Sequence, residues 1–185
     1  MDSTMLSQVE AGPDPGTVPP SADALGADVS AALFNPGVEI AIATLFLVFI
    51  IAIHGIGLGQ ISKFFSSHFV HYTPQTARWR AALLTSVSIA LIVSLHFVET
   101  HIWAGTLLGA QMIGNYRDAY FYVLEAYTTL GEGPGYLPDG YRLMSPIIAL
   151  SGLFTFGWSG SVLVYIVGQT GRLHAERSKA STPAT

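Results

Sequence analysis

The sequence predicts an all-α membrane protein with three transmembrane helices and a shorter, re-entrant helix that dips into the membrane without crossing it. Half of the 185 residues are hydrophobic and only 11% are charged, whereas soluble domains carry about 25% charged residues. Mean hydropathy is +0.47. Three apolar stretches are long enough to cross the hydrocarbon core of a bilayer as helices. Together these observations indicate lipid as the solvent.

Two of the predicted spans lie in the first half of the chain, at 38–58 and 81–103. Both consist almost entirely of Ile, Leu, Val, Ala and Phe, interrupted by a few polar side chains. The connection at 60–79 is polar but carries one apolar stripe. That pattern is typical of an amphipathic helix lying on the membrane surface.

The third span is predicted at 143–168, with glycines inside it. Gly157 is a candidate gating hinge that lets this helix bend, although glycine equally permits close helix packing. Residues 171–185 are expected to form a cytoplasmic tail. Residues 1–36 are rich in Pro, Gly, Ser and Asp and are predicted to be a disordered external tail.

The distribution of charge predicts the orientation. The first 37 residues contain five acidic residues and no Lys or Arg. One side of the membrane would carry six basic residues: Lys63, Arg78, Arg80, Arg172, Arg177 and Lys179. The other side would carry two, Arg117 and Arg142. Because Lys and Arg accumulate on the cytoplasmic side, the N-terminus is expected outside and the C-terminus inside. The chain has no basic patch, so no nucleic-acid partner is expected.

A different kind of segment, at 117–134, separates the second and third spans. Its apolar part is only about ten residues long, which is too short to cross the membrane and predicts a re-entrant half-helix. A stretch rich in Gly and Pro follows it. Non-helical backbone at membrane depth is tolerated only where protein or water surrounds it, and its carbonyls can replace the hydration shell of a cation.

Six residues in this segment resemble a known motif: Thr128, Thr129, Leu130, Gly131, Glu132 and Gly133. They are similar to the potassium-channel signature Thr-Thr-x-Gly-Tyr-Gly. The order of outer helix, pore helix, filter and glycine-containing inner helix also resembles the bacterial potassium-channel-like pore-domain (ion channel) family, over roughly 38–168. The resemblance implies a homotetramer in a bacterial inner membrane. It also implies that these six residues bind potassium or another monovalent cation through backbone carbonyls and the Thr129 hydroxyl.

The same resemblance assigns supporting roles and shows departures. Glu125, Tyr127 and Arg142 would support the filter from behind. Glu132 replaces the filter tyrosine, which implies relaxed selectivity between potassium and sodium. Pro134 replaces the aspartate that usually follows, and a rigid mouth there would suit a filter that does not conduct.

Polar residues within the spans suggest further interpretations. His96, Glu99 and His101 are either a metal site or a hydrogen-bonded cluster that braces the second span against the pore helix. His54 and His96 would hold a haem only if they lay at similar depth, and the predicted span ends place them at different depths.

Two alternatives to the channel stay open. One is a non-conducting structural subunit packed against unrelated membrane-complex subunits and lipids, and the other is a haem- or metal-bearing subunit. No organic cofactor is expected. The sequence contains no nucleophile–base pair, phosphate loop or zinc spacing, so an enzyme is not expected either.

Overall fold

A computed structural model of the chain describes residues 36–131, 137, 141 and 143–180. The predicted disordered tail therefore lies outside the described residues, except for its last residue. The same is true of Glu132, Gly133, Pro134 and Arg142, which the sequence analysis singled out.

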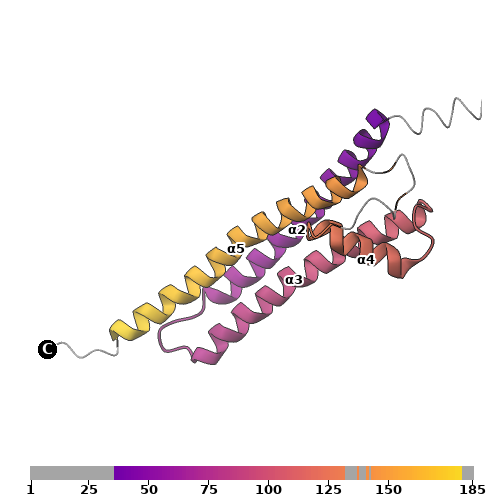
Figure 1. Cartoon of the computed structure of the whole chain (residues 1–185). Coiled ribbons are helices and arrows are strands. Elements are labelled where there is room, and N and C mark those ends of the chain that lie inside the picture. The colour runs from indigo at the N-terminus through magenta and orange to yellow at the C-terminus, as the bar shows by residue number, and fades with distance from the viewer. Residues whose placement is uncertain (1–35, 132–136, 138–140, 142, 181–185) are drawn as a thin grey trace, which may run out of the picture.

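The described part of the chain is all-helical, with no strand (Figure 1). It contains α2 (Pro36–Phe69), α3 (Arg78–Gly109), α4 (Tyr116–Tyr127) and α5 (Met144–Ala180). The helices α2, α3 and α5 are each long and apolar enough to cross a membrane. They lie side by side, and the short α4 packs at one end between α3 and α5.

The three long helices extend past the predicted spans. With 34, 32 and 37 residues, each is about 50 Å long, against a hydrocarbon core of about 30 Å. The predicted tail at 171–185 is helical as far as Ala180, because α5 continues past the predicted span. The apolar pattern marks the part of a helix that suits lipid, but a helix ends only where its backbone is interrupted.

The prediction of an amphipathic surface helix at 60–79 is wrong. Its first half continues α2 without a break as far as Phe69. Ile61 and Phe65 from the apolar stripe are buried in the bundle together with Leu84 and Ile166. The stripe therefore packs against helices instead of lying on a membrane surface.

Two apolar clusters fill the bundle, one on each side of His54. One cluster includes Ile50, Trp103 and Ile148 together with the buried side chains of α4. The other begins at Leu58. The buried His54 lies one turn from both Ile50 and Leu58 on α2, so a polar layer separates the two apolar cores.

Polar contacts close both ends of the bundle. At the α4 end, the backbone N–H of Leu143 donates to the Glu39 carboxylate over 2.9 Å. At the other end, Arg177 donates to the carbonyls of Pro74 and Thr76. The C-terminal part of α5 therefore lies beside the α2–α3 connection, at the end where the charge argument groups the six basic residues.

Glycine allows the closest approach between α4 and α5. A Cβ atom at Gly152 would overlap the carbonyl oxygen of Tyr127, the last residue of α4. By contrast, a Cβ at Gly157, the predicted hinge, or at Gly168 would meet nothing within 4 Å. Close packing therefore depends on Gly152, and Gly157 is not needed for contact within one chain.

Gly152→Ala should push α4 away from α5 and destabilise the protein by roughly 1–3 kcal/mol, the usual cost of overpacking. Gly168→Ala is the matched control, because replacing a helical glycine in open space is expected to stabilise by about 0.5–1 kcal/mol. Thermal unfolding of both variants in detergent checks this. Equal stabilities would contradict the packing.

Candidate functional site

The short helix α4 begins and ends with defined capping contacts. Asn115 caps its N-terminus, accepting a hydrogen bond from the Asp118 backbone N–H over 2.9 Å. Asp118 also puts a carboxylate in the first turn, where the helix dipole favours negative charge. One face of the helix, including Ala119, Val123 and Tyr127, is buried against the spans. The short helix predicted from the sequence in this segment therefore corresponds to α4, which has 12 residues.

The chain turns sharply after α4. The N–H of Thr129 donates to the Ala126 carbonyl over 3.0 Å, and the N–H of Leu130 donates to the Glu125 carbonyl over 2.9 Å. This pair of bonds is a Schellman motif, which satisfies the last carbonyls of a helix. The backbone from Thr128 to Gly131 is therefore a tight turn that closes the end of α4. The helix end needs donors, and this turn supplies them.

Thr129 adopts an unusual backbone conformation, with φ of 60°. Schellman motifs normally place glycine there, and a β-branched residue in this region is strained by on the order of 1–3 kcal/mol. Gly131 also has a positive φ, of 69°. Strain of this kind tends to persist at functional sites, so Thr129 is a candidate for function on structural grounds as well.

The other described residues of the predicted filter lie on the surface of the single chain. Thr128 and Leu130 are exposed, and the Thr128 hydroxyl donates to the Leu124 carbonyl over 2.7 Å. Glu125 is half-buried. Glu132 and Gly133 complete the filter-like motif, and Arg142 was predicted to support it. All three lie outside the described residues.

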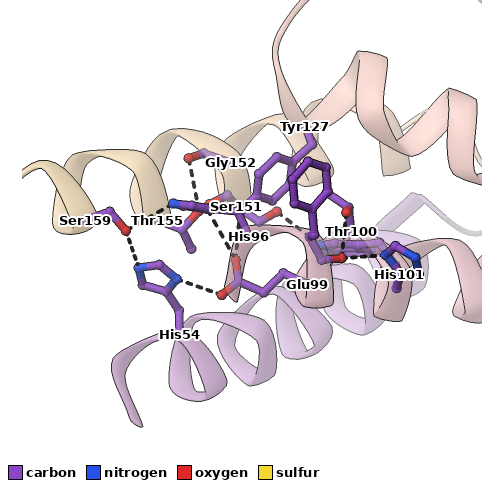
Figure 2. A network of polar contacts seen from close by, with 12 residues as sticks. His54, His96, Glu99, Thr100, His101, Tyr127, Ser151, Gly152, Thr155 and Ser159 are labelled. Atoms are coloured by element: carbon purple, nitrogen blue, oxygen red, sulfur yellow. Dashed lines mark hydrogen bonds and ion pairs between the residues drawn. The ribbon is translucent and has the colours of Figure 1, made fainter. Parts of the chain in front are cut away.

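Tyr127 points away from this turn, into a buried polar cluster (Figure 2). Its hydroxyl donates to Glu99 Oε2 over 2.7 Å, and the other oxygen of Glu99 lies 2.7 Å from His54 Nδ1. His54 and Glu99 are fully buried, and Tyr127 is nearly so. Burial raises the pKa of Tyr127 well above its ordinary value, which keeps the hydroxyl protonated.

Ser159 on α5 joins the two histidines. Its hydroxyl lies 3.2 Å from His54 Nε2 and 3.1 Å from His96 Nε2. The other ring nitrogen of His96 lies 2.9 Å from the Tyr127 hydroxyl. Five side chains from four helices thus form a closed loop of hydrogen bonds, which we call the polar ring (Figure 2). Its members are His54, His96, Glu99, Tyr127 and Ser159.

Hydroxyl groups on α5 extend the polar ring toward the core. Thr155 Oγ1 lies 2.6 Å from the Tyr127 hydroxyl. One turn earlier, Ser151 accepts a hydrogen bond from the Trp103 indole over 3.1 Å. Ser151, Thr155 and Ser159 therefore present one polar stripe to α3 and α4.

The polar ring changes the candidate set for a metal. His101 is exposed and its ring contacts the Phe97 carbonyl of its own helix, so it is not part of the cluster. His54 joins His96 and Glu99 instead, with ligand atoms within 4.8 Å of one another. Those same atoms already bond to each other or to Ser159 and Tyr127. These hydrogen bonds connect α3 to α4, as the bracing interpretation expected, and they also connect both helices to α2 and α5.

The interpretation that His54 and His96 lie at different depths is wrong. Their ring centroids are 5.2 Å apart, because α2 is longer than its apolar stretch and His54 lies near its middle. The Ser159 hydroxyl bridges their Nε2 atoms, so both of the nitrogens that could ligate a haem iron from this side already have a hydrogen-bond partner.

Sequence reasoning missed Thr155 and Ser159 as members of this site. A usable signal was present. Ser151, Thr155 and Ser159 recur every four residues along the otherwise apolar stretch 146–160, which places them on one face.

No family model, curated protein or solved structure matches the chain. The site is therefore interpreted from its own geometry.

Tyr127→Phe should destabilise the protein by about 1–3 kcal/mol, because it leaves buried polar atoms of Glu99 and His96 without a partner. Tyr165→Phe is the control, since the Tyr165 hydroxyl is exposed and lies 3.4 Å from Ser66. Unfolding of both variants in the same detergent measures the difference. A loss no larger than that of the control would contradict the bracing role.

Proposed function

We propose that this chain is one subunit of a tetrameric, potassium-channel-like cation pore. The observation that carries the proposal is the combination of α4 with the turn that follows it. A helix of 12 residues, about 18 Å long, is too short to span the bilayer. It packs between two candidate spans and ends at the Thr128–Gly131 part of the filter-like motif.

The backbone after α4 supports cation binding by carbonyl groups. The N–H groups of Thr129, Leu130 and Gly131 all donate back to α4 carbonyls. Their own carbonyl oxygens are then the groups available to a ligand. These residues are exposed in the single chain, where a second copy could approach them. Backbone carbonyls arranged in a ring are what a cation filter requires.

The helix dipole favours the same ligand. The C-terminal end of α4 carries partial negative charge, and Thr128 and Thr129 follow it directly. A cation held there gains from that charge. One copy cannot enclose such a site, so four copies around a common axis are the proposed assembly.

Ion flux tests the proposal. Purified protein in liposomes should pass both potassium and sodium, because Glu132 replaces the filter tyrosine of the similar motif. Glu132→Tyr should shift the preference toward potassium. Glu132→Gln removes the charge without adding an aromatic side chain, so this variant should still pass both potassium and sodium. Empty liposomes give the background.

Absence of flux in all three proteins over a range of pH and voltage would contradict the channel. Mass measurement of the purified complex then identifies the alternative. A homotetramer is expected for the pore, whereas one copy beside unrelated proteins would favour the non-conducting structural subunit.

The proposed orientation has its own test, which is simple because the chain has no cysteine. A single cysteine at Gly114, before α4, should react with a membrane-impermeant thiol reagent applied to intact cells. One at Gln75, between α2 and α3, should react only after permeabilisation. Both positions are exposed. The reverse labelling pattern would place the N-terminus inside.

A further inference from the structure

The polar ring has one hydrogen bond for each of its five members. Its links measure 2.7 Å from Glu99 to His54, 3.2 Å from His54 to Ser159, 3.1 Å from Ser159 to His96, 2.9 Å from His96 to Tyr127, and 2.7 Å from Tyr127 to Glu99. Each link joins two nitrogen or oxygen atoms at hydrogen-bond distance. A closed ring therefore needs five hydrogens, one in every link.

Counting hydrogens shows a deficit in the ordinary ionisation state. With Glu99 ionised and both histidines neutral, each imidazole supplies one hydrogen, and Ser159 and Tyr127 supply one each. That makes four hydrogens for five links. One link would then have two acceptors facing each other, and the buried ring would carry a negative charge.

We propose that the polar ring is a binding site for one additional proton, which completes the ring and cancels its charge. Two arrangements hold this proton. In one, His54 is doubly protonated and Glu99 is ionised. His54 then donates both to Glu99 and to Ser159, and the donation continues from Ser159 to His96, from His96 to Tyr127 and from Tyr127 to Glu99. In the other, Glu99 is protonated and donates to Tyr127, and Ser159 donates to His54. Both have five hydrogens and no net charge.

Burial favours the proton-loaded state. His54 and Glu99 are fully buried in the bundle, where a net charge is costly and a neutral, fully bonded network is not. The groups facing the ring are His54 from α2, His96 and Glu99 from α3, and Tyr127 from α4. Facing it from α5 are the hydroxyls of Ser159 and Thr155 and the uncharged indole of Trp158.

His96 is the most exposed member of the polar ring. Its side chain is 12% exposed, whereas those of His54 and Glu99 are 0% exposed. The imidazole of His96 borders a groove of about 280 Å³, lined also by Phe97, Thr128 and Phe156. Both nitrogens of His96 are bonded within the polar ring. A proton therefore enters when a bond at His96 opens toward the groove, and it then redistributes through the links.

Proton binding predicts a specific pH dependence of stability. In the unfolded chain the five side chains hold about four protons well above pH 6.5, five near pH 6.5, and six well below it, since histidine ordinarily titrates near 6.5. The folded ring holds five throughout. Its contribution to stability should therefore peak near pH 6.5. Above about pH 7.5 the unfolding constant should rise tenfold per pH unit until the ring loses its proton.

Glu99→Gln isolates this effect. The carboxamide has nearly the same shape and supplies a hydrogen of its own, so the ring closes with five hydrogens and needs no extra proton. The variant should fold at pH 7 yet lose the alkaline decline seen in the parent. Glu176→Gln, on an exposed part of α5, should keep the parent's dependence. Unfolding of the full chain in detergent between pH 5.5 and about pH 9 measures all three.

Ser159→Ala provides a second variant because it removes the atom that bridges both histidines. It should be less stable than the parent at pH 7, and its alkaline decline should begin at a lower pH, because the opened network holds the extra proton less tightly. Ser161→Ala, two residues along α5 and exposed, should change neither.

Two results would overturn the proposal. One is a Glu99→Gln variant with the parent's alkaline decline. The other is a purified parent protein containing one transition metal ion per chain, because a metal would take the atoms that hold the proton. Neither measurement uses ion flux, so failure here leaves the proposed pore intact, and absence of flux leaves the proton site intact.

Discussion

A carboxylate buried among apolar helices requires partners for both of its oxygens, and Glu99 is arranged to meet that requirement. Its two oxygens bond to His54 on α2 and Tyr127 on α4, each over 2.7 Å. Breaking either contact would leave a charged or polar atom unsatisfied in a medium that cannot hydrate it. The relative positions of α2, α3 and α4 therefore depend on one side chain, and Ser159 extends the same dependence to α5.

This polar layer lies between two apolar clusters, and the three together explain where α4 sits. Interdigitated apolar side chains hold the helices together, and the closed hydrogen-bonded ring adds directional contacts that accept one register. Tyr127 is a member of the ring and also the last residue of α4. The register of the ring therefore determines where the strained turn at Thr129 lies, and with it the proposed cation site. Gly152 completes the arrangement by letting the end of α4 approach α5 closely.

Much of the fold was predictable from the sequence, because length and hydropathy identify helices that suit a bilayer. The existence of three long helices and of the short α4 follows from those patterns. The helix ends do not, since the backbone of α2 and α5 continues past the apolar residues until something interrupts it. That error moved His54 away from His96 in the sequence interpretation and hid the polar ring. The turn at Thr129 was also beyond prediction, because a threonine in a position that favours glycine contradicts local preference.

A double-mutant cycle between His54→Leu and Tyr127→Phe tests the closed ring most directly. These residues contact different oxygens of Glu99, so a single ring couples them through Glu99 and Ser159. Either change alone opens the ring, and the second change should then cost less. The double variant should be more stable than the sum of the single losses predicts, by on the order of 1 kcal/mol. Strictly additive losses would show that the two bonds act separately and would contradict a ring shared by four helices.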